Sequence, residues 1–357
     1  MDVNILVINP GSTSTKIAVY QNRKEILLLN VKHPQETLAG FPSIMDQLSF
    51  RKDKVRQVLE QAEISIADFN IIVGRGGLLK PMEGGAYRVN EKFVQDMQHP
   101  MGEHESNLGG ILAWEFAREI GPQVIAMIVD PTCVDEMEEM ARISGMPGLE
   151  RRSLLHALNQ KAIARQFAAE QKTTYQQVKV IVAHMGGGIS VGAHSNGRII
   201  DVNNGLDGDG PFSPERSGGL PAGQLVDLCF SGTLTHAQIR ERIKGKGGLM
   251  AYLGTSDALA IEKRIQQGDE KAKTVYLAMA YQVAKEIGAL STVLRGQIDG
   301  ILLTGGLAFS DMLVSDIVQR VQHLGPVKVY PGEGEMKAMA LNAWMVHTEE
   351  LQLKVFE

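Results

Sequence analysis

Asn9-Pro10-Gly11-Ser12-Thr13-Ser14-Thr15-Lys16 joins two short apolar runs rich in β-branched residues, and this placement decides how the fold begins. The runs, residues 3–8 and 17–20, have the length and composition of strands, so the stretch is predicted to be the turn of a β-hairpin. Its serines, threonines and lysine are suited to phosphate, because hydroxyls and backbone N–H groups donate to phosphate oxygens and lysine adds charge. A Walker A loop needs a second glycine and a following helix, and the stretch has neither. A phosphate-binding turn and a plain Ser/Thr-rich turn both remain open.

Length and composition favour a two-domain protein that acts on a small molecule. The 357 residues exceed the usual size of one hydrophobic core, and a hydrophobic content of 44% is enough for two. The formal net charge of -5 and the lack of a dense basic run argue against a nucleic-acid or membrane-surface partner.

The expected location is the cytoplasm. Met1 and Asp2 precede a short apolar run without the basic start or the length of a signal peptide, and no apolar stretch approaches membrane-spanning length. The two cysteines, Cys133 and Cys229, lack metal-ligand spacing and are typical of a reduced intracellular chain.

The order of predicted elements is repeated in the two halves of the chain. The first half is predicted to contain the hairpin, then strand 26–31, helix 55–62, strand 70–73, helix 108–119 and strand 124–129. The second half is predicted to contain a glycine-rich hairpin of strands 178–183 and 189–193, then strands 198–202, 300–304 and 327–330. Matching loops follow strands 70–73 and 300–304, Gly76-Gly77-Leu78 and Gly305-Gly306-Leu307. Chance alternation of strands and helices is the rival explanation, whereas a duplicated α/β unit predicts a ligand cleft between two halves.

Several loops resemble, in order and over nearly the full length, those of the acetate and butyrate kinase family. Asn9 to Lys16 is similar to the family's first phosphate motif, in the form typical of butyrate kinases. Ala183-His184-Met185-Gly186-Gly187-Gly188 resembles the second phosphate loop, and Leu303-Thr304-Gly305-Gly306-Leu307 resembles the adenosine loop.

The resemblance implies two duplicated ribonuclease-H-like domains of the actin-like ATPase type, with a nucleotide cleft between them. Residues 1–150 would form the first, onto which a C-terminal helix near 338–357 packs back. Residues 151–337 would form the second, with the adenosine loop. The implied reaction is ATP plus butyrate giving ADP plus butyryl phosphate, with Mg²⁺, in a homo-oligomer.

The resemblance also implies roles for individual residues. Those placed at phosphate or adenosine are Asn9, Gly11, Ser12, Thr13, Ser14, Lys16, Gly186, Gly187, Gly188, Gly305, Gly306 and Leu307. Those placed at the reacting groups are Arg75 and Arg216 on the carboxylate, His104, His156 and His184 near the phosphoryl path, and Asp130 near metal and phosphate. Glu335 is placed on the magnesium ion, with Glu333 as the alternative.

Structural explanations compete with several of these roles. Arg75 could cap a helix or pair with Glu83, His184 could be a buried core histidine, and Asp130 could be a turn residue before Pro131. His104 stands between two glutamates and could form a surface ion pair. Glu335 could complement the dipole of the following helix, a role compatible with metal binding.

The chemistry fits a carboxylate acceptor. Phosphoryl transfer requires positioning and positive charge more than covalent work. A fatty acid has a pKa near the ~4.3 of a glutamate side chain, so it is already ionised at neutral pH and needs no general base. Two other interpretations stay open. One is a kinase of acetate, propionate or a branched-chain acid, and the other is a non-catalytic nucleotide switch like actin or a chaperone ATPase.

Overall fold

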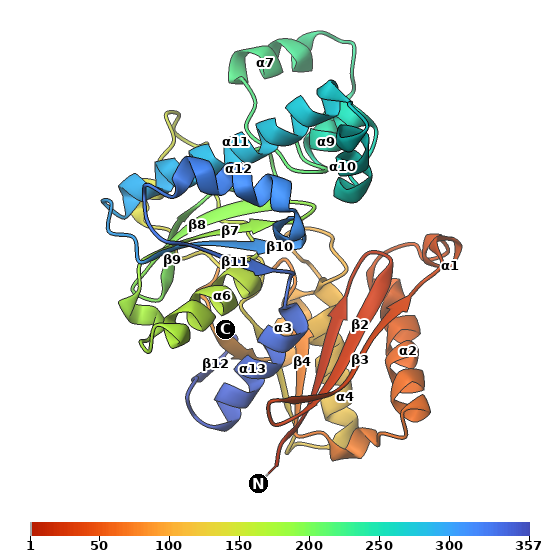
Figure 1. Cartoon of the computed structure of the whole chain (residues 1–357). Helices are drawn as coiled ribbons and strands as arrows, with labels where there is room; N and C mark the ends of the chain where they lie inside the picture. Colours follow the sequence, from red (N-terminus) through yellow and green to blue (C-terminus); the bar gives the residue numbers. More distant parts are fainter. Residues whose placement is uncertain (1) are drawn as a thin grey trace. The chain divides into compact units, whose positions relative to one another are not determined.

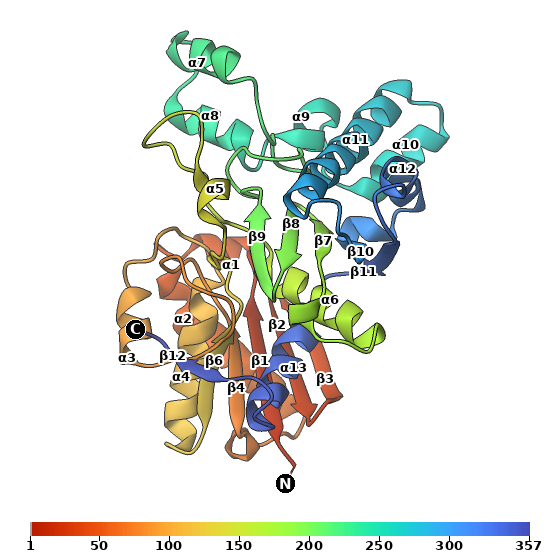
Figure 2. The ribbon, with the colours of Figure 1, turned by 90° about the vertical axis from the view of Figure 1, so that its left-hand side faces the viewer.

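The structure is a computed structural model that describes residues 2–357, and the chain divides into two compact units. Unit 1 contains residues 2–134 and Gly334–Glu357, and unit 2 contains Asp135–Glu333 (Figures 1 and 2). The sequence placed these boundaries near 150 and 337. In the structure the units divide after Val134 and after Glu333, so Glu136 lies with Lys161 in unit 2 and Glu335 lies with Arg75 in unit 1.

Unit 1 is built on a seven-stranded sheet in the order β12-β5-β6-β4-β1-β2-β3. Its strands are β1 (Asn4–Pro10), β2 (Ser14–Gln21), β3 (Lys24–Lys32), β4 (Ile71–Arg75), β5 (Ala86–Arg88), β6 (Ile125–Val129) and β12 (Leu353–Val355). Its helices are α1 (Gln35–Ala39), η1 (Met45–Gln47), α2 (Leu48–Gln61), η2 (Ile66–Asp68), α3 (Glu91–Asp96), α4 (Asn107–Ile120) and α13 (Glu335–His347).

Unit 2 is built on a five-stranded sheet in the order β11-β10-β7-β8-β9. Its strands are β7 (Val180–Met185), β8 (Ile189–Ser195), β9 (Arg198–Val202), β10 (Gly300–Gly305) and β11 (Val327–Pro331). Its helices are α5 (Glu139–Arg142), α6 (Ala157–Glu170), η3 (Tyr175–Gln177), α7 (Ala222–Phe230), α8 (His236–Ile243), α9 (Gly248–Leu253), α10 (Ala258–Gln266), α11 (Glu270–Val293), η4 (Gly306–Phe309) and α12 (Asp311–Val321).

The two sheets share one topology, which confirms the predicted duplication. In unit 1 the order β6-β4-β1-β2-β3 matches β11-β10-β7-β8-β9 of unit 2, with an antiparallel meander beside parallel strands in both. Each meander also has a register shift at an equivalent place, between Val19 and Tyr20 in β2 and between Ala193 and His194 in β8. The short strands β5 and β12 are additions to unit 1 that the sequence did not predict.

The inner strands β1, β4, β7 and β10 are covered on both faces of their sheets, so nearly all of their residues are buried. In unit 1, α4 packs on one face of β1, β4 and β6 while α13 lies on the other (Figures 1 and 2). In unit 2, α6 packs on one face of β7 and β10, and α11 lies on the other. Within residues 2–357, no helix combines the length and the apolar composition that crossing a bilayer requires.

The contact of α4 with β4 depends on glycines. A Cβ added to Gly74 of β4 would lie 1.9 Å from the carbonyl oxygen of Gly109, and one added to Gly109 of α4 would lie 2.4 Å from that of Arg75. Because both obstacles are backbone atoms, a side chain at either position would push the helix off the strand that ends at Arg75.

We predict that Gly74→Ala strongly destabilises the protein, with a loss of several kcal/mol, since the added methyl overlaps backbone in a packed interior. Gly288→Ala is the matched control, because Gly288 lies in α11 and a methyl group added there would meet no atom within 4 Å. There, alanine should stabilise the helix by up to about 1 kcal/mol. Urea unfolding of the two variants measures both effects, and equal stabilities would contradict the close packing of α4 on β4.

Candidate active site

The first glycine-rich hairpin has a shorter turn than the sequence predicted. Strands β1 and β2 pair through Asn9 with Lys16 and Pro10 with Thr15, so only Gly11, Ser12 and Thr13 connect them. The N–H of Gly11 donates to the carbonyl of Ser14 at 2.8 Å. The expectation that all eight residues form the turn was wrong, because the ladder continues to the end of the polar stretch. Ser12 and Thr13 are exposed at its tip.

A buried arginine supports this hairpin from inside unit 1. Arg51 of α2 is fully buried, and its Nη1 donates to the Ser14 carbonyl and to Thr15 Oγ1, both at 3.0 Å. Thr15 Oγ1 also lies 2.8 Å from Nε2 of His33. Burial, with the charges of Arg51 and Lys54, lowers the pKa of His33 to about 4, so this imidazole is neutral at physiological pH. No local pattern in the sequence predicted this support.

Arg75, Glu335 and Asn9 meet in unit 1. Arg75 ends β4, and its Nη2 lies 3.1 Å from Oε1 of Glu335, the first residue of α13. Asn9 Nδ2 donates to the other carboxylate oxygen of Glu335 at 2.7 Å. Among residues 2–357, Nη1 of Arg75 is a buried side-chain nitrogen with no hydrogen-bond partner. The competing explanation, a pairing of Arg75 with Glu83, is not what the ion pair shows, because Arg75 pairs with Glu335.

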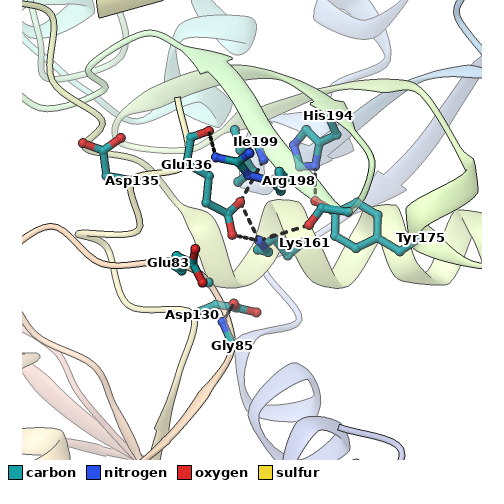
Figure 3. Close-up of polar contacts among 12 residues, drawn as sticks. Glu83, Gly85, Asp130, Asp135, Glu136, Lys161, Tyr175, His194, Arg198 and Ile199 are labelled. Carbon is teal, nitrogen blue, oxygen red and sulfur yellow. Dashed lines mark hydrogen bonds and ion pairs between the residues drawn. The ribbon is translucent and has the colours of Figure 1, made fainter. Parts of the chain in front are cut away.

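Asp130 follows β6 in a strained conformation. It is fully buried with a positive φ of 37°, which an aspartate adopts rarely and which is common at functional sites. Its Oδ1 accepts from the N–H of Gly85 at 2.7 Å (Figure 3). The structure therefore holds this carboxylate rigidly at the carboxyl end of the strand.

His104 is held by a serine two residues further along the chain. It is exposed just before α4, where its Nδ1 accepts from the N–H of Ser106 at 3.1 Å and lies 2.8 Å from the hydroxyl of the same serine. These contacts fix the ring from one side.

In unit 2 the second glycine-rich loop is shaped around Arg216. A Cβ added to Gly188 would lie only 1.6 Å from Nη1 of Arg216, so the guanidinium occupies the space that a side chain would take. Nη1 of Arg216 donates to the carbonyl of Gly205, and the hydroxyl of Ser213 donates to that of Gly187 at 2.6 Å. Burial lowers the pKa of Arg216, which the neighbouring Glu215 partly offsets.

His184 and His156 are brought together in unit 2. Their rings stack with centroids 3.9 Å apart and planes inclined by 16°. His184 Nδ1 lies 2.7 Å from Oδ1 of Asn159, while the Nδ2 of that asparagine donates to the backbone carbonyl of Glu333. A Cβ added to Gly186 would lie 3.3 Å from Nε2 of His184, so this nitrogen faces the glycine-rich loop. Sequence reasoning missed Asn159.

The predicted adenosine loop lies where β10 ends and η4 begins. Gly305 has φ 90°, and a Cβ there would lie 2.3 Å from the carbonyl oxygen of Met185, so only glycine fits. Gly305 and Gly332 exchange backbone hydrogen bonds of 3.1 and 3.0 Å. Gly306 is exposed, and Leu307 is buried in η4.

The carboxylates suit magnesium better than an enclosed metal site. Among the described residues, no group of three or more His, Cys, Asp or Glu side chains could hold a metal. Mg²⁺ usually needs only one or two carboxylates, with water and phosphate as its other ligands. Each carboxylate offers about four lone-pair sites, and Glu335 and Asp130 are carboxylates held in place by N–H donors. The residues therefore fit a magnesium ion bound in that way. Glu333 is exposed.

Comparison with known proteins identifies the family. A family model described as the Acetokinase family matches residues 148–356. A probable butyrate kinase of Bacteroides thetaiotaomicron is 52% identical over 355 residues, 99% of this chain and 100% of that protein. Among solved structures, Porphyromonas gingivalis acetate kinase has a TM-score of 0.76 at 19% identity, covering 96% of this chain and 99% of that one. A propionate kinase from Francisella tularensis has a TM-score of 0.73 at 17% identity, covering 95% and 98%.

The fold and the likenesses define the class first: this is an α/β protein with the actin-like ATPase fold of acetate kinases. The chain belongs to the acetokinase family. The predicted fold class and the family resemblance are thereby confirmed. The roles of the individual site residues stay predictions.

We predict that Gly188→Ala displaces the Arg216 guanidinium and impairs function, whereas Gly187→Ala does not move it. A methyl at Gly187 would lie 3.7 Å from Glu215 Oε2, an ordinary contact, against 1.6 Å from Arg216 at Gly188. Crystal structures of both variants give the position of Arg216. If the guanidinium has not moved in Gly188→Ala, the loop has more space for a side chain than these distances allow, and the prediction is wrong.

Proposed function

We propose that this protein transfers the γ-phosphoryl group of ATP to the carboxylate of a short-chain fatty acid, butyrate first, giving an acyl phosphate and ADP. The relative at 52% identity over the full length carries the name probable butyrate kinase, which supports the acceptor. The family description supports the type of reaction.

The observation on which the proposal depends is that Nη1 of Arg75 is buried without a hydrogen-bond partner among the described residues. A buried guanidinium nitrogen without a partner costs about 1 to 3 kcal/mol, so it calls for an acceptor. An anionic carboxylate is the acceptor that best matches the planar fork of arginine. Because Nη2 is already held by Glu335, the guanidinium is pre-oriented and Nη1 is left to receive a substrate oxygen.

The remaining residues supply what phosphoryl transfer demands. The acid is ionised at neutral pH, so its carboxylate attacks without a general base. Lys16, Arg216 and the histidines are the groups that we assign to the phosphate oxygens, where they stabilise negative charge. The glycine-rich loops at Gly11, at Gly186–Gly188 and at Gly305–Gly306 are assigned to the nucleotide through their backbone N–H groups.

Magnesium is the implied metal, and Glu335 and Asp130 are the residues that we assign to it. When bound, it neutralises charge on the phosphate oxygens of the nucleotide. Glu335 has two parts in this scheme. It is one of the two carboxylates assigned to the metal, and its oxygens also hold Arg75 and Asn9 in place.

Chain length and assembly belong to the same proposal. Each methylene in an apolar pocket changes discrimination by only ~1 to 3 kcal/mol, so acetate and propionate are expected to be poorer but real acceptors.

We also propose that the protein assembles as a homo-oligomer, with a dimer as the first expectation. The exposed apolar residues of α7, with Phe230 87% and Val226 53% exposed, support an association surface in unit 2.

We predict that the wild-type protein forms an acyl phosphate from ATP, Mg²⁺ and butyrate, trapped as the hydroxamate with hydroxylamine. Arg75→Ala should lower kcat/KM for butyrate by about 10²-fold or more, because it removes charged hydrogen bonds to the acid. Nucleotide binding, measured by calorimetry with ADP, should change little. Arg88→Ala, an exposed arginine on β5, is the matched control.

Two results would contradict the proposal. If the wild-type protein forms no hydroxamate from any acid between acetate and hexanoate, the function is wrong and the nucleotide switch becomes the better interpretation. If Arg75→Ala forms acyl phosphate as fast as the Arg88→Ala control, the kinase stands but the assignment of Arg75 to the carboxylate is wrong.

A further inference from the structure

We propose that Asn159 and a buried hydrogen-bond chain, Tyr175-His194-Gln160-Ser190, are positioning residues that give the two stacked histidines different roles. They hold His156 as a neutral donor and allow His184 to become the cation. The catalytic meaning of this inference rests on the proposed function, whereas the assignment of protons rests on geometry alone.

The direction of the chain is set at Gln160. Its Nε2 lies 2.9 Å from the backbone carbonyl of Ser190, which can only accept, so the amide nitrogen must face Ser190. The amide oxygen therefore faces His194, whose Nε2 lies 3.0 Å away. His194 must carry its proton on Nε2 to donate to that oxygen.

His194 then needs a donor at its other nitrogen. It is fully buried, and burial with the nearby charges of Lys161 and Arg165 keeps its pKa well below the usual value, so the ring is neutral. With the proton on Nε2, its Nδ1 is an acceptor and receives the hydroxyl proton of Tyr175 at 2.8 Å (Figure 3). Lys161 is fixed there by Glu136, at 2.6 and 2.7 Å.

The other end of the chain reaches His156 through Ser190. The Ser190 hydroxyl oxygen receives the Gln160 amide at 2.9 Å, and the backbone N–H of His156 points at it from 3.4 Å. Among the contacts described for this hydroxyl, Nδ1 of His156, at 3.0 Å, is the only acceptor for its proton. His156 is therefore held with Nδ1 unprotonated and its proton on Nε2.

A proton added to Nδ1 of His156 would face a hydroxyl oxygen that already accepts, and it would strand the hydroxyl proton of Ser190. Ser190 thus opposes the addition of a second proton to His156 at Nδ1.

His184 carries its proton on the other ring nitrogen, Nδ1. Asn159 turns its oxygen to His184 because its nitrogen donates to the Glu333 carbonyl, so His184 carries a proton on Nδ1. Neutral His184 therefore presents an unprotonated Nε2 beside Gly186, and it can donate from that nitrogen only as the imidazolium. Protonation at Nε2 breaks no hydrogen bond to Asn159.

Because the two rings stack, their different hydrogen bonds decide which of them carries a positive charge. Two imidazolium rings 3.9 Å apart would repel each other strongly, so the pair accommodates one positive charge. Since Ser190 opposes a proton on His156 and Asn159 tolerates one on His184, the charge goes to His184. In the proposed reaction His184 stabilises the transferring phosphoryl group as a cation, and His156 donates from Nε2 as a neutral ring. No proton needs to move during transfer.

We test the assignment by long-range ¹H–¹⁵N spectra of protein with labelled histidine rings, with signals assigned through His156→Gln and His184→Gln. The expected result at neutral pH is the Nε2–H tautomer for His156 and a proton on Nδ1 for His184. On acidification His184 should become doubly protonated while His156 stays neutral. An Nδ1–H tautomer at His156, or protonation of His156 before His184, would overturn the proposal whatever the enzymatic activity is.

Gln160→Glu is the sharper variant. A carboxylate cannot donate to Ser190, so the Ser190 hydroxyl turns toward it and His156 must donate from Nδ1. We expect the His156 tautomer to reverse and kcat to fall roughly tenfold or more, with KM for ATP within twofold. Ser291→Ala, a buried serine outside the chain, is the control and should leave the His156 signals and kcat unchanged. An unchanged His156 tautomer in Gln160→Glu would contradict the chain, and should that variant fail to fold, the wild-type spectra decide.

Discussion

One carboxylate ties together three distant parts of unit 1. Glu335 opens α13 near the end of the chain, and its two oxygens engage Arg75 at the end of β4 and Asn9 at the end of β1. The contact with Asn9 spans 326 positions in the sequence. Both ends of the ion pair are largely buried, so removing either partner costs stability. The orientation of Arg75, and with it the place proposed for the substrate carboxylate, depends on this contact.

The duplicated topology explains why the candidate groups appear where they do. In both sheets the parallel strands carry their polar residues at the carboxyl end, where ligands bind in open α/β sheets. Arg75 ends β4 and Asp130 follows β6 in unit 1, while His184 lies near the end of β7 and Gly305 ends β10 in unit 2. Glycines at these ends keep the space open, as Gly188 does for Arg216. The same strand plan thus presents an arginine and an aspartate in unit 1 and a histidine and a glycine turn in unit 2.

The sequence predicted the ten principal strands, the duplication and the loops, because strand periodicity and glycine-rich turns are local signals. It could not predict Arg51 or Asn159. Each is a polar residue inside an ordinary helical pattern. The hairpin residues that Arg51 contacts lie 36 and 37 positions away, and His184 lies 25 positions from Asn159, so only tertiary packing reveals these contacts. The left-handed backbone of Asp130 was also missed, because the preceding strand and following proline favour extended conformations. His156 was expected from resemblance alone, and its stacking on His184 came from the fold.

A double-mutant cycle on the unfolding free energy of the ligand-free protein, with Arg75→Met, Glu335→Gln and the double variant, tests the central contact most directly. Each single change removes one partner of the ion pair and the double change removes both, so we expect a coupling of at least about 1 kcal/mol. Effects that add within about 0.5 kcal/mol would show that Glu335 does not hold Arg75 in solution.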